Sequence, residues 1–197
     1  MFNKVKILVL AASFFTVCQL NAQDAFSLGP RVGVNFSNFS HVDNSKSLLG
    51  PVFGLTTTYS INETTGISVD FLYSKEGYKV GDNDAKVNYF QVPITFDLFF
   101  GALGESFRPK AYVGIAPEFL LGAKLNDTTV DKSNYNSLNL ALVGGLGFNA
   151  RVANRIWLNT DLRAFLGLTD VVKVIPEKQT NNTIQFSLGL AYGISKI

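Results

Sequence analysis

The stretch IQFSLGLAYGISKI, residues 184–197, decides the fold class of this chain. Up to residue 195, large apolar or aromatic side chains alternate with small or neutral ones along it. An alternation of period two predicts a β-strand, because successive side chains of a strand point to opposite faces. Small neutral side chains suit the crowded interior of a narrow barrel, whereas a soluble strand normally turns charged residues to water. The large apolar face must then meet lipid, where a closed β-barrel is the stable form of sheet.

Residues 1–22 have the organisation of a secretory signal peptide. Lys4 and Lys6 precede an apolar run at residues 7–17, and the small residue Ala22 follows. We therefore expect cleavage near Ala22. The apolar run is too short to span a bilayer, and no later run of about 18 uncharged apolar residues exists, so no transmembrane helix is expected.

The mature chain, residues 23–197, is expected to form one outer-membrane β-barrel domain. Removal of the two signal lysines lowers the basic count from 17 to 15, which equals the acidic count of 15. This neutral balance argues against a nucleic-acid partner. The single cysteine, Cys18, lies in the signal, so no disulfide is available to the mature fold.

Alternation predicts an all-β fold, an eight-stranded antiparallel up-and-down transmembrane β-barrel. The strands are expected at residues 28–38, 51–61, 67–78, 87–100, 110–124, 138–152, 156–169 and 182–196. These lengths suffice for tilted strands, which need about 9 to 11 residues to cross the hydrocarbon core. Pro93 falls inside the fourth strand, where it removes a ladder donor, so a local bulge is expected there.

The connections between these strands are expected to alternate between long and short. Long polar connections are predicted at residues 40–50, 81–86, 125–137 and 171–181, and tight turns at 62–66 and 153–155. In outer-membrane barrels the short turns face the periplasm, so both termini are expected on that side. The turn at residues 101–109 is longer than this rule predicts.

Charged residues are absent from the predicted outward faces and collect on the inward faces. The predicted lumen charge network consists of Arg31, Asp70, Asp97, Glu118, Arg151, Asp161 and Arg163. The interior of an eight-stranded barrel is just wide enough for side chains to fill it. We therefore expect each arginine to contact a carboxylate, which makes a polar plug instead of an open pore.

The last strand also carries the pattern Ser187-x-Gly189-x-x-Tyr192-x-Ile194. It resembles the polar-x-Gly-x-x-aromatic-x-hydrophobic signal by which the outer-membrane assembly machinery recognises its clients. The spacing matches at every position. Many such proteins end on an aromatic residue, whereas this chain continues to Ile197.

Four further motifs resemble the PorT-like outer-membrane β-barrel family. They are GPRVGVNFS at residues 29–37, YFQVPI at 89–94, KAYVG at 110–114 and GGLGF at 144–148. The resemblance covers essentially the whole mature chain. It implies a small barrel of the gram-negative outer membrane, with some members linked to protein secretion, and it brings no catalytic residues.

Two polar clusters resemble sites, but neither has the full pattern of one. Ser40, His41 and Asp43 suggest acyl transfer, but no oxyanion hole is visible and His41 is the sole histidine. Residues 82–84, with the sequence DND, lack the glycine and distal glutamate of a calcium loop and read as a polar turn. Phosphate-loop, dinucleotide and zinc motifs are absent, so we expect no enzyme activity, cofactor or metal.

These observations favour a non-enzymatic integral outer-membrane barrel that acts in an envelope interaction or in secretion. Its expected partners are outer-membrane lipid, the outer-membrane assembly machinery and an envelope protein bound through the long loops. Two alternatives stay open. A small-solute porin is disfavoured by the narrow lumen. A secreted lipocalin-like barrel that binds an apolar ligand would turn the apolar face inward.

Overall fold

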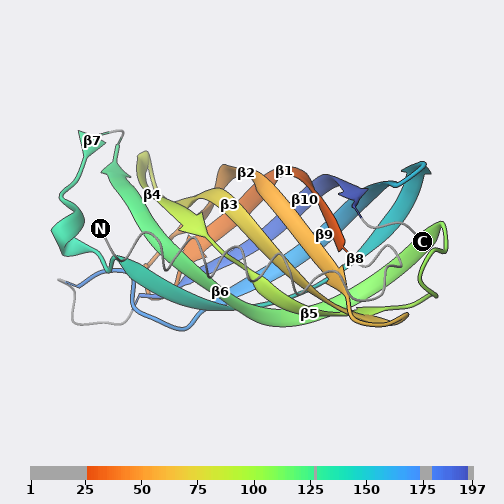
Figure 1. Cartoon of the computed structure of the whole chain (residues 1–197). Coiled ribbons are helices and arrows are strands. Elements are labelled where there is room, and N and C mark those ends of the chain that lie inside the picture. The colour runs from red at the N-terminus through yellow and green to blue at the C-terminus, as the bar shows by residue number, and fades with distance from the viewer. Residues whose placement is uncertain (1–25, 127, 174–178, 195–197) are drawn as a thin grey trace, which may run out of the picture.

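The computed structural model describes residues 26–126, 128–173 and 179–194, which form one antiparallel barrel (Figure 1). The predicted signal peptide, residues 1–22, lies outside the described residues. The strands are β1 (Phe26–Phe39), β2 (Lys46–Ser60), β3 (Thr65–Val80), β4 (Asn83–Gln91), β5 (Ile94–Phe99), β6 (Phe107–Leu125), β7 (Thr128–Thr129), β8 (Leu138–Ala153), β9 (Ile156–Gly167) and β10 (Asn181–Gly193). A short 3₁₀-helix, η1, spans Lys132–Asn134. Among the described residues, no helix has the length and apolarity needed to cross a membrane.

The strands close into a ring with eight positions. Neighbours pair in the order β2-β1-β10-β9-β8-β6, and β3 returns to β2. β4 and β5 share one position, because each pairs with both β3 and β6 over a different part of their length. β7 pairs with β6 alone and extends a connection. The predicted eight-stranded antiparallel barrel is therefore the observed fold.

Pro93 explains why one predicted strand appears as two. Residues 87–100 were predicted as a single strand, but the ladder breaks between Gln91 and Ile94. Proline has no backbone N–H to donate. Around the break, Val92 N donates to Pro117 O at 2.9 Å and Asp70 N donates to Pro93 O at 3.0 Å. The neighbouring strands thus hold the interrupted segment in place.

The two ends of the barrel differ in their connections. Tight connections at residues 61–64 and 154–155, with the longer one at 100–106, share one end with both ends of the described chain, where Ser27 pairs with Gly193. We call this the short-turn end. The opposite, long-connection end carries residues 40–45, 81–82, 126, 128–137, 168–173 and 179–180, among them β7 and η1.

The predicted long loop at residues 81–86 was wrong. β3 continues to Val80 and β4 begins at Asn83, so Gly81 and Asp82 form a tight hairpin turn. Likewise β2 begins at Lys46, before the predicted residue 51. Outward residues near this end, such as Lys79 of β3 and Lys86 of β4, are polar, so the apolar alternation ended before the strands did.

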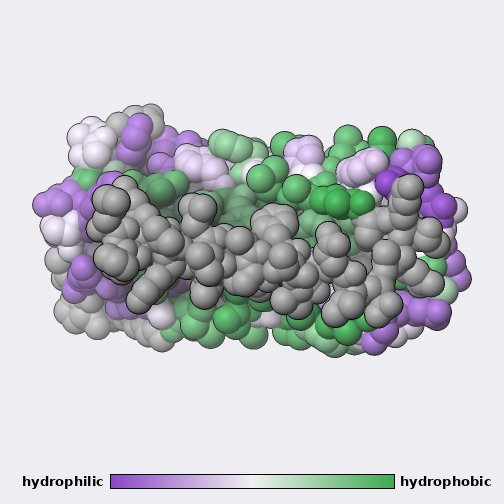
Figure 2. Space-filling view, viewed as in Figure 1, coloured by the Kyte–Doolittle hydropathy of each residue, from purple (hydrophilic) through white to green (hydrophobic). Residues whose placement is uncertain are grey.

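The apolar and polar faces lie as the alternation predicts. On β10, Gln185 and Ser187 are fully buried, whereas Phe186 and Leu188 are exposed on the outside. Figure 2 shows hydrophobic side chains over the middle of the barrel and hydrophilic ones gathered at both ends. Such a band, with polar rims, is the surface of a barrel that sits in lipid.

Candidate functional site

The centre of the lumen holds a set of buried charged side chains that come from four strands. Alternation turns Arg31 of β1, Asp70 of β3, Lys110 of β6, and Asp161 and Arg163 of β9 inward. Each of these residues is at most 3% exposed. We call these five residues the central charge network.

Two carboxylates are each shared by several cations in this network. Asp161 Oδ2 lies 2.5 Å from Arg31 Nη1 and 3.8 Å from Arg163 Nη2, while its Oδ1 lies 2.9 Å from Lys110 Nζ. Asp70 Oδ2 lies 2.5 Å from Arg163 Nη1 and 3.4 Å from Arg31 Nε. Removal of one partner from such a buried pair leaves a charge without compensation, which costs several kcal/mol.

Neutral groups complete the coordination of Arg31. Its Nη1 donates to Ser187 Oγ at 2.9 Å and its Nη2 donates to Thr56 Oγ1 at 3.0 Å. The planar guanidinium therefore contacts β2, β3, β9 and β10 at once. Arginine suits this role because its donors fan out in one plane. The contacts join β3 to β9 across the lumen.

Lys110 belongs to this network, although it was not among the residues predicted for it from the sequence. It was read as the first residue of a strand, where lysine commonly reaches toward the membrane surface. The signal that identifies it is its even position, shared with the inward residues Tyr112, Ala116 and Glu118 of β6.

Two predicted members, Asp97 and Glu118, are buried in the barrel but lie outside the central charge network. Asp97 is buried nearer the short-turn end and accepts hydrogen bonds from Thr95 Oγ1 at 2.8 Å and from Ser68 Oγ. Glu118 is buried nearer the long-connection end and accepts one from Gln91 Nε2 at 2.7 Å.

The structure does not bring Arg151 into the lumen. It is exposed near the end of β8, and its guanidinium carbon lies 5.1 Å from the centre of the Trp157 ring. Its placement in the charge network was therefore wrong. Alternation indicates the side of a strand but not the depth, and this position falls at the rim.

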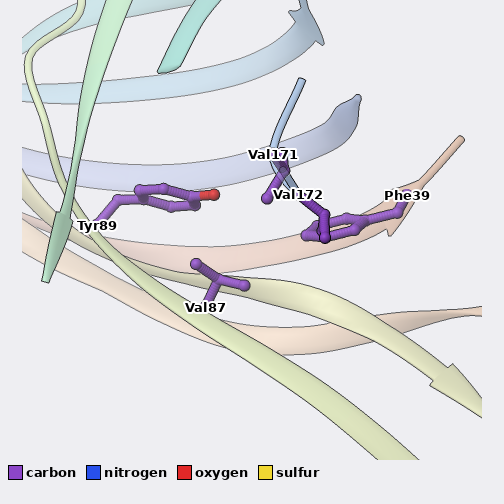
Figure 3. Close-up of a cluster of buried hydrophobic side chains, with 5 residues drawn as sticks. All are labelled: Phe39, Val87, Tyr89, Val171 and Val172. Carbon is purple, nitrogen blue, oxygen red and sulfur yellow. The ribbon is translucent and has the colours of Figure 1, made fainter. Parts of the chain in front are cut away.

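A buried hydrophobic cluster closes the lumen at the long-connection end. Figure 3 shows Val171 and Val172 between Tyr89 and Phe39, with Val87 nearby. We call these five residues the apolar cap. Val171 N donates to Gln179 O at 2.9 Å, and Val171 O accepts from Asn136 N at 3.0 Å. The β9–β10 connection is thus tied to the β6–β8 connection and places two valines inside the barrel mouth.

The rest of the β6–β8 connection is ordered by local hydrogen bonds. Asp131 caps η1 and accepts from Ser133 N at 2.9 Å, and these bonds hold the pKa of the Asp131 carboxyl below its usual range. Tyr135 forms an isolated bridge with Val172. The exposed side chains here are polar, and include Lys132 and Asn134.

A small cavity of about 30 Å³ lies at the short-turn end. Its lining residues are Ser27, Thr58, Ser60, Leu103, Gly104, Arg108, Asn149, Trp157 and Gly193. A volume of this size holds about one or two water molecules. Arg108 closes one side, donating to Glu63 O at 2.6 Å, with its guanidinium carbon 4.1 Å from the Phe99 ring centre.

The residues of the predicted assembly signal divide between the two faces of β10. Ser187 and Gly189 face the lumen, and Gly189 pairs with Arg31 of β1. Tyr192 and Ile194 are exposed on the outer surface. Their role in recognition stays a prediction.

The polar clusters at residues 40–43 and 82–84 lie at the long-connection end. Ser40 Oγ accepts from Thr180 N at 2.9 Å, while His41 is exposed in a turn with φ of 56°. In the β3–β4 hairpin, Asn83 Oδ1 accepts from Asn126 Nδ2 at 2.6 Å and Asp84 pairs with Lys86 at 2.9 Å. Within the described ranges, no three His, Cys, Asp or Glu side chains come together as metal ligands.

Comparison with known proteins agrees with this architecture. The family model of the outer membrane protein beta-barrel domain matches residues 21–173. The chain belongs to this family. Membership, together with the lipid-facing surface, indicates an outer-membrane location. No curated protein matches the sequence significantly.

Three solved structures share the family's barrel fold. Neisserial surface protein A has a TM-score of 0.65 at 15% identity, over 88% of this chain and 99% of that chain. OprG from Pseudomonas aeruginosa has a TM-score of 0.52 at 13% identity, over 85% and 94%. Outer Membrane Protein W of E. coli has a TM-score of 0.50 at 15% identity, over 89% and 100%. At these identities the likeness concerns the fold alone.

Proposed function

We propose that this protein is a non-enzymatic, non-conducting outer-membrane barrel that presents its long-connection end to an envelope partner. The observation that carries the proposal is closure of the lumen at two levels. The central charge network joins opposite walls, and the apolar cap fills the mouth. A small-solute porin requires a continuous water path, for which eight strands leave little room.

The long-connection end provides the surface for such a partner. Backbone hydrogen bonds such as Lys173 N to Asn134 O at 2.9 Å join the segment around Val172 to the end of η1, and β7 is held by its pairing with β6, so the backbone that carries the polar side chains here is ordered. A pre-ordered surface loses less conformational entropy on binding. Its exposed polar residues, such as Lys132, suit a protein of the envelope, in keeping with the PorT-like motifs and the secretion link of that family. We also propose that the membrane is that of a gram-negative bacterium and that its outer-membrane assembly machinery inserts the barrel.

Conductance tests the filled lumen. We expect the purified, refolded protein to give no steady conductance step in planar lipid bilayers, because the network and cap block water and ions. A stable channel that passes small solutes would replace this proposal with the porin alternative.

Site-specific photo-crosslinking in intact cells tests the partner. We expect a crosslinker at Lys132 to give a discrete adduct, whereas the same group at the exposed residue Asn62 of the short-turn end gives none at that mass. Equal patterns from both positions, or no adduct from Lys132, would contradict an interaction through the long-connection end.

A further inference from the structure

Lysines gather at the long-connection end of four neighbouring strands. β2, β3, β4 and β6 run side by side (Figure 1), and near this end they carry the exposed or partly exposed residues Lys46, Lys75, Lys79, Lys86 and Lys124. β1, β8, β9 and β10, which form the other side of the barrel, have no basic residue at this end. We call the five residues the lysine patch. Its positive charge lies on one side of the barrel.

The alternation of the strands sets the direction of these side chains. On β4 and β6, Val87 and Ala123 are buried inside the barrel, so the adjacent Lys86 and Lys124 point outward. Lys75 takes the same outward position on β3, between residues that are buried. The patch therefore projects sideways from the wall of the barrel, toward whatever surrounds the strands in the membrane.

Aromatic side chains of the same four strands lie next to the patch, on its membrane side. The ring centres of Phe53 and Tyr73 are 5.0 Å apart, and those of Phe90 and Phe119 are 6.3 Å apart. We call these four residues the aromatic row. Lys75 follows Tyr73 by two residues, which is about 7 Å along a strand. Aromatic rings of this kind mark the edge of the lipid, so the lysines lie at the height of the headgroups.

Two pairs of lysines in the patch are directly opposite each other in the ladders. Lys46 pairs with Lys79 between β2 and β3, and Lys86 pairs with Lys124 between β4 and β6. Like charges in directly opposite positions repel each other and destabilise a sheet. A bound anion would remove this repulsion.

The neighbouring acidic residues compensate the patch only in part. Asp84 is outward on β4, and its Oδ2 lies 2.9 Å from Lys86 Nζ. The other carboxylates of the four strands are buried in the lumen: Asp70, Glu76 and Glu118. Exposed carboxylates of the flanking connections are Asp43, Asp82 and Asp131. With Lys132, six lysines stand against four outer carboxylates among the described residues, so the charge here stays positive.

Phosphate is the anion that suits this patch. A phosphate ester carries about two negative charges and accepts charge-assisted hydrogen bonds from several ammonium groups. The two opposed lysine pairs are separated by two strand spacings across the sheet, about 10 Å. A headgroup with phosphates at both ends of a disaccharide can reach both pairs, whereas a headgroup with one phosphate reaches one pair at a time.

We propose that the lysine patch binds one bisphosphorylated glycolipid of the outer leaflet, with a phosphate at each lysine pair and the acyl chains against the aromatic row. A lipid fits better than a soluble partner because the lysines point sideways at headgroup height. The inference rests on the proposed function, in which the long-connection end faces outward from the cell.

Binding of lipid A in detergent tests the site. The refolded barrel is titrated with bisphosphorylated lipid A in neutral detergent, and native mass spectrometry counts the lipid that stays bound. We expect one lipid A per wild-type barrel. K79Q/K124Q should lower the affinity by about tenfold or more, because each pair loses one charged donor to phosphate. Lipid A with a single phosphate, and phosphatidylglycerol, should bind the wild type about tenfold more weakly.

R151Q/K173Q is the matched control, because it removes two positive charges from exposed residues outside the patch. It should bind lipid A as the wild type does, and so should K79R/K124R, which keeps both charges. Heat-modifiable migration on gels checks that every variant is folded. Equal affinity of K79Q/K124Q and wild type, or equal affinity of the wild type for phosphatidylglycerol and lipid A, would overturn the inference. Neither result would touch the filled lumen or the envelope partner, which conductance and crosslinking test separately.

The repulsion between Lys86 and Lys124 gives a second test. Without lipid A, K124Q should raise the urea midpoint of unfolding in neutral detergent, because it removes a like charge opposite Lys86. With saturating lipid A, the wild type is stabilised in proportion to its affinity, so K124Q should unfold at a lower midpoint than the wild type. An effect of the same sign in both conditions would contradict a phosphate site at this pair.

Discussion

Arg163 contacts both acidic members of the central charge network, so it is the residue with which to test that network. Its replacement by methionine leaves Asp70 with Arg31 and leaves Asp161 with Arg31 and Lys110. We expect R163M to lower the free energy of unfolding by about 3 kcal/mol, the lower part of the range for a broken buried pair. Urea titration followed by tryptophan fluorescence measures the change.

R151M is the matched control, since it makes the same substitution at an exposed residue. Arg151 lies over Trp157 at the rim, where a cation–π contact contributes about 0.5 to 1 kcal/mol. The control should therefore change stability by no more than this. Equal unfolding midpoints for R163M and R151M would contradict the assignment of Arg163 to a buried network.

Single residues show how far alternation predicts the site. Arg31, Asp70, Asp161 and Arg163 were predicted in the lumen because their parity turns them inward, and the structure brings them together. Glu76 has the same parity, but it lies beside Lys75 near the expected end of its strand and was not singled out. Parity does not specify depth along the barrel axis, so neither this position nor the rim position of Arg151 was predictable.

At the scale of the element, β10 closes the ring by pairing with β1, and Tyr192 lies on its outer face. If the signal-like pattern is recognised during assembly, Y192D should lower the yield of folded barrel in membranes severalfold. Heat-modifiable migration on gels measures this yield. Tyr59 is the control, because it is also exposed on the outside near the short-turn end but lies in β2.

An aspartate in place of either tyrosine puts a charge in the lipid interface at a similar cost in free energy. Any further loss of folded-barrel yield in Y192D therefore reports on β10 itself. Equal yields of Y192D and Y59D would remove the support for an assembly signal at this position.

The β9–β10 connection yields another prediction. V171D places a charge inside the apolar cap, where burial without a partner costs several kcal/mol. We expect the connection to leave the barrel mouth while the barrel remains folded, because the ladders do not depend on it. Limited proteolysis should cut V171D faster than wild type within residues 168–180. K173D changes an exposed neighbour and should be cut at the wild-type rate; equal rates for both variants would argue against the cap.

The elements also show where sequence patterns lose information. The membrane-crossing parts of all eight strands were predicted, because lipid on one side and a narrow lumen on the other impose a strict alternation. The continuation of β3 and β4 to a tight hairpin was not predicted, since the outward residues there, such as Lys79 and Lys86, are polar. The cap was not predicted either, because its contacts join residues distant in the sequence, such as Phe39 and Val171.

The whole molecule is a closed barrel, with large apolar side chains on the outside and polar ones inside. The sequence predicted this architecture from period-two patterns and connections, and the ring of pairings confirms it. The lipocalin-like alternative has the opposite orientation, because its apolar face would line the interior. The transmembrane barrel and the lipocalin-like barrel therefore predict opposite patterns along β10: in each pair of neighbouring residues, they disagree on which side chain faces outward.

Site-directed spin labelling along β10 measures this most directly, because the residues that the structure describes contain no cysteine. Single cysteines at residues 184–190 are labelled in lipid vesicles, and collision with oxygen, which concentrates in lipid, is recorded. We predict an accessibility of period two, high at Ile184, Phe186, Leu188 and Leu190 and low at Gln185, Ser187 and Gly189. A flat profile, or high values at the second set, would contradict it.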